Sequence, residues 1–213
     1  DMTIRTSLLE ARLIAGDERR YGALRQRFWN EITRGTAAEF IDAKLAERRL
    51  RHERFGGSRY SVEPNLKEGK GGLRDLQTLY WIGKYVYHVE SARDLVGAGV
   101  LSDEELDQFE AAEAFLWEVR CQLHFIAGRP EEKLSFDRQL DLARKFGFTD
   151  RADTKGVEAF MKRYFHVAKQ VGDLTRVIVQ LLEAQQKRSW GPLARFFSLE
   201  TWRGSIGGAF RIE

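Results

Sequence analysis

The chain has 213 residues and a formal net charge of +3, with 35 Lys and Arg against 32 Asp and Glu, and it contains one cysteine, Cys121. Charges this evenly balanced do not predict a nucleic-acid partner, and a single cysteine excludes an internal disulfide and weakly favours a reducing compartment. No apolar run approaches the roughly 18 residues needed to span a bilayer, and the first residues lack a signal-peptide pattern. We therefore expect a cytoplasmic, predominantly helical protein that binds neither nucleic acid nor membrane.

The first 54 residues predict three helices. Apolar residues recur at helical spacing over residues 3–15 and 18–32. Thr36 and Glu39 have the spacing of a capping box, so a third helix should follow and reach about Arg54. The side chains expected on its buried side are Phe40, Ile41, Ala43, Leu45 and Leu50. The charged end of this helix contains His52, which we interpret as polar surface because no second metal ligand stands at a suitable spacing.

The most distinctive stretch runs from Glu63 to Trp81 and is a glycine-rich loop that opens into an amphipathic helix. Just before it, Tyr60 and Val62 alternate with polar residues, which predicts a short extended segment. Glycines at positions 69, 71 and 72 allow positive φ and a close approach of the backbone to a ligand. The N-terminus of the helix offers N–H groups that favour an anion.

Three cations, Lys67, Lys70 and Arg74, lie in or beside this loop, and Gln77 shares a helix face with Arg74. These residues indicate a site for a phosphate or a carboxylate. The alternative is an ordinary loop with solvated lysines.

Neither common phosphate-binding fingerprint fits the loop. A P-loop needs a glycine, four further residues and then Gly-Lys-Ser/Thr, but this chain has Pro64 at the position of the first glycine and Gly71 after Lys70. The dinucleotide fingerprint would need a third glycine where Arg74 stands.

The remaining chain predicts a short helix after Ser91, a long helix from a capping box at Ser102 to about Ala127, a shorter one near residues 136–147, and a final long helix over residues 154–186. On the first long helix, Arg120 and His124 flank the apolar stripe, so they either face solvent or reach a polar cleft beside the core. In sum, the pattern predicts an all-α bundle of roughly seven or eight helices with one short extended segment before the glycine-rich loop.

Catalytic motifs are missing from the chain. No Asp-x-Asp pair is present to hold the two metal ions of a nucleotidyl-transfer site, and no histidine is followed by aspartate. Taken alone, the sequence does not look like a complete enzyme.

The stretch from Glu63 to Trp81 closely resembles the helical region of bacterial bifunctional protein-PII uridylyltransferase/uridylyl-removing enzymes. The similarity also takes in residues 1–16, 44–52 and 173–177, and covers roughly residues 1–186. The glutamine synthetase adenylyltransferase family is a relative, which shares patterns at residues 71–75 and 120–124. Glu-Pro-Asn before the loop and Gln-Thr-Leu after it favour the uridylyltransferase branch.

The resemblance implies an enzyme that uses UTP and Mg²⁺ to place UMP on a tyrosine of PII when glutamine is low, and that hydrolyses it off when glutamine is high. It implies that the transfer carboxylates precede this chain and that a His-Asp hydrolytic domain and glutamine-sensing domains come after it. Mg²⁺ ligands and catalytic residues are then expected outside the chain. Residues 1–54 would be the last helices of the nucleotidyltransferase region, residues 55–188 the associated helical domain, and residues 189–213 a linker.

On this resemblance, Lys67, Lys70 and Arg74 would face the transferase cleft and bind the triphosphate or the acidic surface around the target tyrosine. Gln77, Arg120 and His124 are further candidates for the same cleft. Two alternatives stay open: a non-catalytic helical module that docks PII, and a part of a glutamine synthetase adenylyltransferase.

Overall fold

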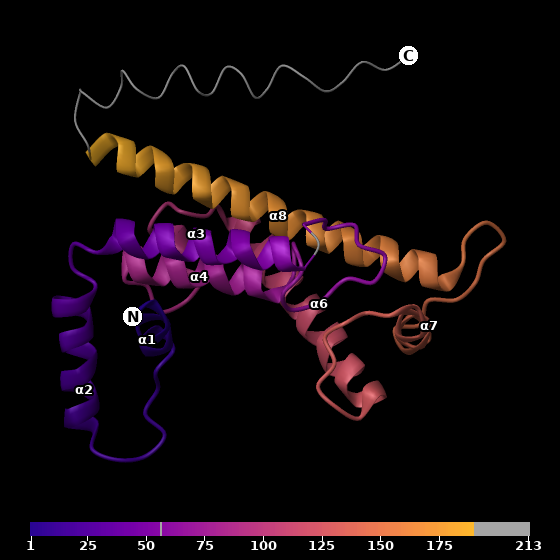
Figure 1. Cartoon of the computed structure of the whole chain (residues 1–213), viewed down its shortest axis with the longest axis horizontal. Coiled ribbons are helices and arrows are strands. Elements are labelled where there is room, and N and C mark those ends of the chain that lie inside the picture. Colours follow the sequence, from indigo (N-terminus) through magenta and orange to yellow (C-terminus); the bar gives the residue numbers. More distant parts are fainter. Residues whose placement is uncertain (56, 190–213) are drawn as a thin grey trace.

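A computed structural model describes residues 1–55 and 57–189, and within them the chain is all-α (Figure 1). The elements are α1 (Met2–Leu9), α2 (Glu18–Arg27), a π-helical turn η1 (Phe28–Ile32), α3 (Ala37–Arg54), α4 (Leu73–Tyr87), α5 (Asp94–Gly97), α6 (Asp103–Ala127), α7 (Phe136–Lys145) and α8 (Gly156–Ser189). The expected all-α class is confirmed. The predicted linker lies, from residue 190 onward, outside the described residues.

The longest helix, α8, packs against α4, and α3 and α4 run side by side (Figure 1). α6 and α7 pack against α8 toward its N-terminal end, and α1 packs on α4. α4 is therefore the central element, in contact with α1, α3, α6 and α8. None of the helices in residues 1–55 and 57–189 is long and apolar enough to cross a membrane.

Within the described residues, one hydrophobic cluster joins the helices and is centred on α4. Leu73, Leu76, Leu79 and Ile82 of α4 are all buried in it, and each such side chain contributes about 1.5–3 kcal/mol on burial. Tyr85, near the end of α4, stacks on Phe40 of α3 with a centroid distance of 3.9 Å. This contact joins the N-terminal helices to the rest of the bundle.

The expected extended segment at Tyr60 and Val62 is wrong, because Tyr60 lies in a turn and Val62 in a bend. An isolated antiparallel bridge forms further on, between Asn65 and Lys133. Leu66 N–H donates to the carbonyl of Glu132 over 2.8 Å, and no strand forms among the described residues. Before this bridge, the backbone carbonyl of Val62 has a side-chain hydrogen-bond donor, because the Gln139 amide donates to it over 2.7 Å. A side chain of α7 thus supplies the hydrogen bond that a neighbouring strand would otherwise supply.

Two N-terminal helices differ from the prediction. The helix expected over residues 3–15 ends at Leu9, and the one expected over residues 18–32 changes to a π-helical turn at Phe28. In this turn, Thr33 N–H donates to the Phe28 carbonyl over 3.1 Å. The turn accompanies the burial of Phe28, whose ring meets Tyr85 edge-on. Such local changes in helical winding follow tertiary packing and are invisible to periodicity.

The predicted capping boxes had different outcomes. At the start of α6, Ser102 and Glu105 bond each other's backbone N–H groups, so that box is confirmed. Thr36 is the N-cap of α3, but its hydroxyl does not cap the helix and instead pairs with the Tyr85 hydroxyl over 2.7 Å. The expected box at Thr36 is therefore wrong, because the hydroxyl bonds both Tyr85 and the preceding carbonyl of Ile32, which lies 2.8 Å away.

Candidate functional site

The glycine-rich loop folds back on the start of α4 and occupies its N–H groups. Leu73 N–H donates to the carbonyl of Leu66 over 3.0 Å, and Arg74 N–H donates to that of Lys67 over 2.9 Å. Asn65 Oδ1 in turn accepts from the N–H of Glu68 over 2.7 Å. The predicted anion site on free helix N–H groups is therefore wrong, because loop carbonyls already satisfy these donors.

The glycines of the loop let its backbone pack closely against other parts of the chain. Gly71 has φ +82°, and a Cβ there would lie 2.4 Å from the carbonyl oxygen of Ala168 in α8. A Cβ on Gly72 would lie 2.6 Å from the carbonyl oxygen of Leu66. Both glycines are buried, so they hold the loop against α8 and against itself, and they do not open the backbone to a ligand.

The loop is joined to α3 through Asp75, whose side chain is completely buried. Its carboxylate accepts hydrogen bonds from Arg48 Nε at 3.1 Å, Arg51 Nη2 at 2.6 Å, His52 Nε2 at 2.9 Å and the N–H of Gly71 at 2.9 Å. The interpretation of His52 as polar surface is therefore wrong. His52 is largely buried because its partner, 23 residues later in sequence, lies beside it in space.

Asp75 is held as a carboxylate. Burial by itself would raise its pKa, but the hydrogen bond from His52, the charges of Arg48 and His52, and the N–H of Gly71 outweigh burial. The pKa of Asp75 therefore lies well below its ordinary value. The cluster fixes the orientation of Arg51, which borders a polar cleft on the other side.

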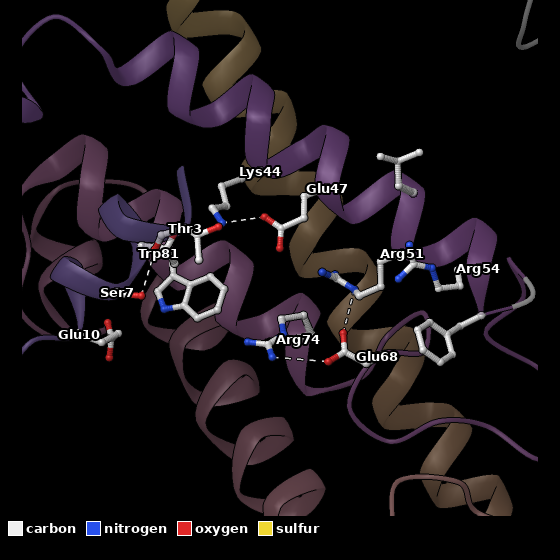
Figure 2. A pocket seen from close by; sticks show the side chains of 13 residues that line it. Thr3, Ser7, Glu10, Lys44, Glu47, Arg51, Arg54, Glu68, Arg74 and Trp81 are labelled. Atoms are coloured by element: carbon white, nitrogen blue, oxygen red, sulfur yellow. Dashed lines mark hydrogen bonds and ion pairs between the residues drawn. The ribbon is translucent and has the colours of Figure 1, made fainter. Parts of the chain in front are cut away.

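This polar cleft, of about 820 Å³, lies between α1, α3 and α4 (Figure 2). Its lining combines small hydroxyl residues of α1, charged residues of α3, and Glu68, Arg74 and Trp81. The α3 residues that line it are Lys44, Glu47, Leu50, Arg51 and Arg54. Of the residues that we predicted as a site, only Arg74 borders this cleft.

Two carboxylates of the cleft lie beside lysines, one of which, Lys84, is shared with Glu90 at 3.6 Å. Glu47 lies 2.7 Å from Lys44, and Glu10 lies 3.7 Å from Lys84. Arg54 is exposed and forms no ion pair within the described part of the chain. Near the centre lie Arg74 and Arg51, the latter also paired with Asp75, with Glu68 between them (Figure 2). The cleft thus suits an anionic ligand.

Trp81 forms an aromatic wall of the cleft. Lys44 and Arg74 each carry a cation near its ring, at 5.5 Å and 5.3 Å from the centroid. Ser7 of α1 and Trp81 both line the cleft (Figure 2). An aromatic face between two cations can hold a flat ring beside a phosphate.

The other predicted residues near the loop are less central. Lys67 lies 3.7 Å from Glu68, and Lys70 forms no ion pair in the described ranges. Gln77 accepts a hydrogen bond from Arg74 Nη1 over 2.9 Å. Gln77 therefore orients Arg74 and does not border the cleft itself.

Arg120 and His124 lie on α6 beside a different carboxylate. Arg120 binds Glu132 with both Nε and Nη2, and this ion pair raises the pKa of Arg120. His124 Nε2 is 3.7 Å from the same carboxylate and has no hydrogen-bond partner among the described residues. Glu132 adjoins the loop through its backbone bond to Leu66. The pair is thus next to the loop but outside the cleft.

Sequence reasoning missed the contribution of α3. Lys44 and Arg51 are 4% and 8% exposed, whereas Leu50, which we expected to be buried, is 64% exposed. A signal was present, because Phe40, Lys44 and Arg51 share one helix face at spacings of four and seven residues. The inward face of α3 changes from apolar to cationic along its length.

A family model described as GlnD PII-uridylyltransferase matches residues 39–179 of this chain. The chain belongs to this family. The match takes in α3 and almost all of the elements after it, including Arg51, Glu68, Arg74 and Trp81 of the cleft. The predicted resemblance is therefore confirmed.

Relatives in the PII-uridylyltransferase family are similar over most of the chain. The bifunctional uridylyltransferase/uridylyl-removing enzyme of Bradyrhizobium sp. (strain ORS 278) is 54% identical over 207 residues, which are 95% of this chain and 22% of the relative. The enzymes of the same name from Rhodospirillum rubrum and Azospirillum brasilense are each 55% identical over 188 residues, 88% of this chain and 20% of theirs. The chain thus spans about a fifth of the length of these relatives. No solved structure matches it.

Proposed function

We propose that this chain is a helical part of a bifunctional enzyme that transfers UMP from UTP to a tyrosine of PII, with release of pyrophosphate, and that removes UMP again by hydrolysis. The observation that carries the proposal is the 54–55% identity to enzymes of that name over 88–95% of the chain. Glutamine as the regulatory signal, and a cytoplasmic location where UTP is available, are parts of the same proposal.

Within that enzyme, the cleft between α1, α3 and α4 contributes to binding of the nucleotide. Arg51, Arg74 and the exposed Arg54 supply positive charge for the triphosphate. Trp81 supplies a flat apolar surface suited to a base. These residues bind and orient a ligand, whereas bond making and breaking belong to residues outside the chain.

Mg²⁺ enters the proposal as a requirement of the nucleotidyl-transfer reaction. The described residues contain no group of three His, Cys, Asp or Glu side chains that could hold a metal ion. The buried carboxylate of Asp75 is already shared by three basic side chains, so it does not suit a metal. We therefore assign no residue of this chain to the ion.

The alternative, a non-catalytic module that docks PII, has a different observation in its favour. A largely apolar groove of about 450 Å³ lies between the segment before the loop, α7 and the first turns of α8. Tyr60, Val62, Phe136 and Leu140 line it and are exposed. Exposed apolar surface of this kind marks interaction sites in many proteins.

UTP binding separates the two functions. We expect the chain to bind UTP weakly and in a salt-sensitive way, and Arg74→Ala to weaken this binding by roughly 10- to 100-fold, because one charge-assisted contact to phosphate is lost. Arg19→Ala, which removes an exposed arginine of α2 away from the cleft, should leave binding unchanged. Isothermal titration calorimetry at two salt concentrations measures both variants.

The same pair of variants can be tested in a full-length enzyme that carries this sequence. Uridylylation of PII should slow in Arg74→Ala and remain normal in Arg19→Ala. Unchanged kinetics in Arg74→Ala, together with no UTP binding by the chain, would favour the docking module.

A further inference from the structure

Glu68 stands among three cations and is held tightly by none of them. Its carboxylate lies 3.5 Å from Arg74 Nη2, 3.7 Å from Lys67 Nζ and 3.8 Å from Arg51 Nε. Charge-assisted hydrogen bonds between such groups are usually about 2.7–2.9 Å long. The carboxylate therefore balances the charge of the cleft without forming a close bond.

Arg51 has a donor that Glu68 does not satisfy. The Arg51 side chain is 8% exposed and its Nη2 donates to Asp75 over 2.6 Å, but its Nε is buried and has no hydrogen-bond partner in the described part of the chain. A buried donor on a cation is rarely left unpaired, since its desolvation is uncompensated. Arg51 Nε therefore marks a place where a better acceptor fits.

The side chain of Glu68 can move while its backbone stays in place. The N–H of Glu68 donates to Asn65 Oδ1, and the next residues are held by the bonds between the loop and α4. The side chain is 23% exposed and points into the cleft between α3 and α4 (Figure 2). A change of rotamer would free the space between Arg51 and Arg74.

We infer that Glu68 is a resident counter-anion, which occupies the place of a ligand phosphate in the cleft and leaves it when a phosphorylated ligand binds. The inference rests on the proposed role of the cleft in nucleotide binding. It adds that Glu68 competes with the nucleotide for the cations of the cleft. A phosphate group has several oxygens and up to two charges, so it can approach Arg51 Nε and Arg74 together. Glu68 then sets a threshold concentration for the ligand, because its carboxylate competes with the phosphate.

The test compares binding of inorganic triphosphate to the 213-residue chain and to Glu68→Gln. Glutamine keeps the shape of the side chain and removes the charge that repels the ligand, so we expect about tenfold tighter binding. The control is Asp141→Asn, which removes a half-exposed carboxylate of α7 that is paired with Arg138 over 3.4 Å. It should bind as the unchanged chain does, because it changes the net charge by the same amount outside the cleft.

A second measurement separates this role from a purely structural one. Without triphosphate, Glu68→Gln should melt at a lower temperature, since the three cations lose their counter-charge. Added triphosphate should raise its melting temperature more than it raises that of the unchanged chain. A structural role alone would lower the melting temperature and leave the response to triphosphate unaltered.

The outcomes distinguish this inference from the proposed function. If the chain binds triphosphate and Arg74→Ala weakens binding, but Glu68→Gln binds equally or more weakly, the cleft keeps its function and the role of Glu68 is refuted. If neither the unchanged chain nor Glu68→Gln binds triphosphate, the role of the cleft in nucleotide binding and the role of Glu68 are both refuted, and the docking module is favoured.

Discussion

At the scale of single residues, Asp75 holds the candidate site together. It lies at the start of α4, but three of its four partners come from α3 and the fourth from the glycine-rich loop. The charge of such a buried carboxylate is compensated by its basic partners, and the carboxylate compensates their charge. Removing one member of a buried ion cluster is strongly destabilising, because the remaining charges stay buried without compensation.

We therefore predict that Asp75→Asn destabilises the chain by about 3–5 kcal/mol. The control Asp141→Asn breaks a half-exposed ion pair and should change stability by about 1 kcal/mol or less. Urea denaturation followed by circular dichroism measures both. A midpoint for Asp75→Asn equal to that of the unchanged chain would show that the cluster does not stabilise the fold.

The pH dependence follows from the direction of the Asp75 shift. Its pKa is depressed in the folded chain, so its contribution to stability is present above the unfolded-state pKa of about 3.9 and is lost as pH falls through the folded-state pKa. Acid should therefore destabilise the unchanged chain more steeply below about pH 4 than it destabilises Asp75→Asn. Parallel stability curves for the two below that pH would contradict this assignment.

At the scale of elements, the loop and α4 behave as one unit. The carbonyls of the loop cap α4, and the glycines let the loop lie directly on α8. A glycine-rich loop before a helix is often associated with a phosphate, but here the same features serve internal packing. The positive charge of the site comes from side chains of α3 and α4.

Gly71→Ala tests this packing. At Gly71, alanine meets both an unfavourable φ of +82° and the carbonyl of Ala168 at 2.4 Å, so we expect a loss of several kcal/mol of stability, on the order of 3 or more. Gly128→Ala is the matched control, since Gly128 has φ +64° and nothing within 4 Å of the added Cβ in the described part of the molecule. It should lose only about 1 kcal/mol.

Thermal or urea denaturation of the two glycine variants measures the difference. Equal losses of stability in the two variants would mean that α8 can move away from the loop with little change in free energy. The loop would then not be fixed against α8.

At the scale of the whole molecule, the predicted boundary between residues 54 and 55 crosses a continuous core. Leu9, Phe40 and Ile41 lie in the same buried cluster as α4 and α8. The boundary itself stays a prediction about the organisation of a longer enzyme. Physically, the loop and α4 require α3, because Arg48, Arg51 and His52 surround Asp75.

Two truncations test this dependence. A chain of residues 55–213 should fail to fold cooperatively, because it exposes Tyr85 and removes the three basic side chains that hold the Asp75 carboxylate. A chain of residues 37–213 keeps α3 and should retain a cooperative melting transition at a lower temperature. Circular dichroism during heating measures both, and a cooperative transition for residues 55–213 would show that the two parts fold independently.

Much of the molecule was predictable from the sequence because much of it depends on near neighbours. The helical class, the extent of α3, the capping box and extent of α6, and the family all derive from spacings or motifs within short stretches. The same local reasoning placed Arg74 and Gln77 on adjoining parts of one helix, where they bond each other.

The tertiary structure alone decided what those stretches do. His52 and Arg51 are buried because Asp75, more than twenty residues away in sequence, requires them. The Thr36 hydroxyl bonds Tyr85 and the Ile32 carbonyl and does not cap α3, and the loop carbonyls occupy the helix N–H groups that an anion would need. Periodicity indicates which side of a helix faces inward. Which residues that side contacts depends on how segments distant in sequence pack together. For that reason the sequence indicated a cationic loop, whereas the candidate site that the structure offers is the cleft between α1, α3 and α4.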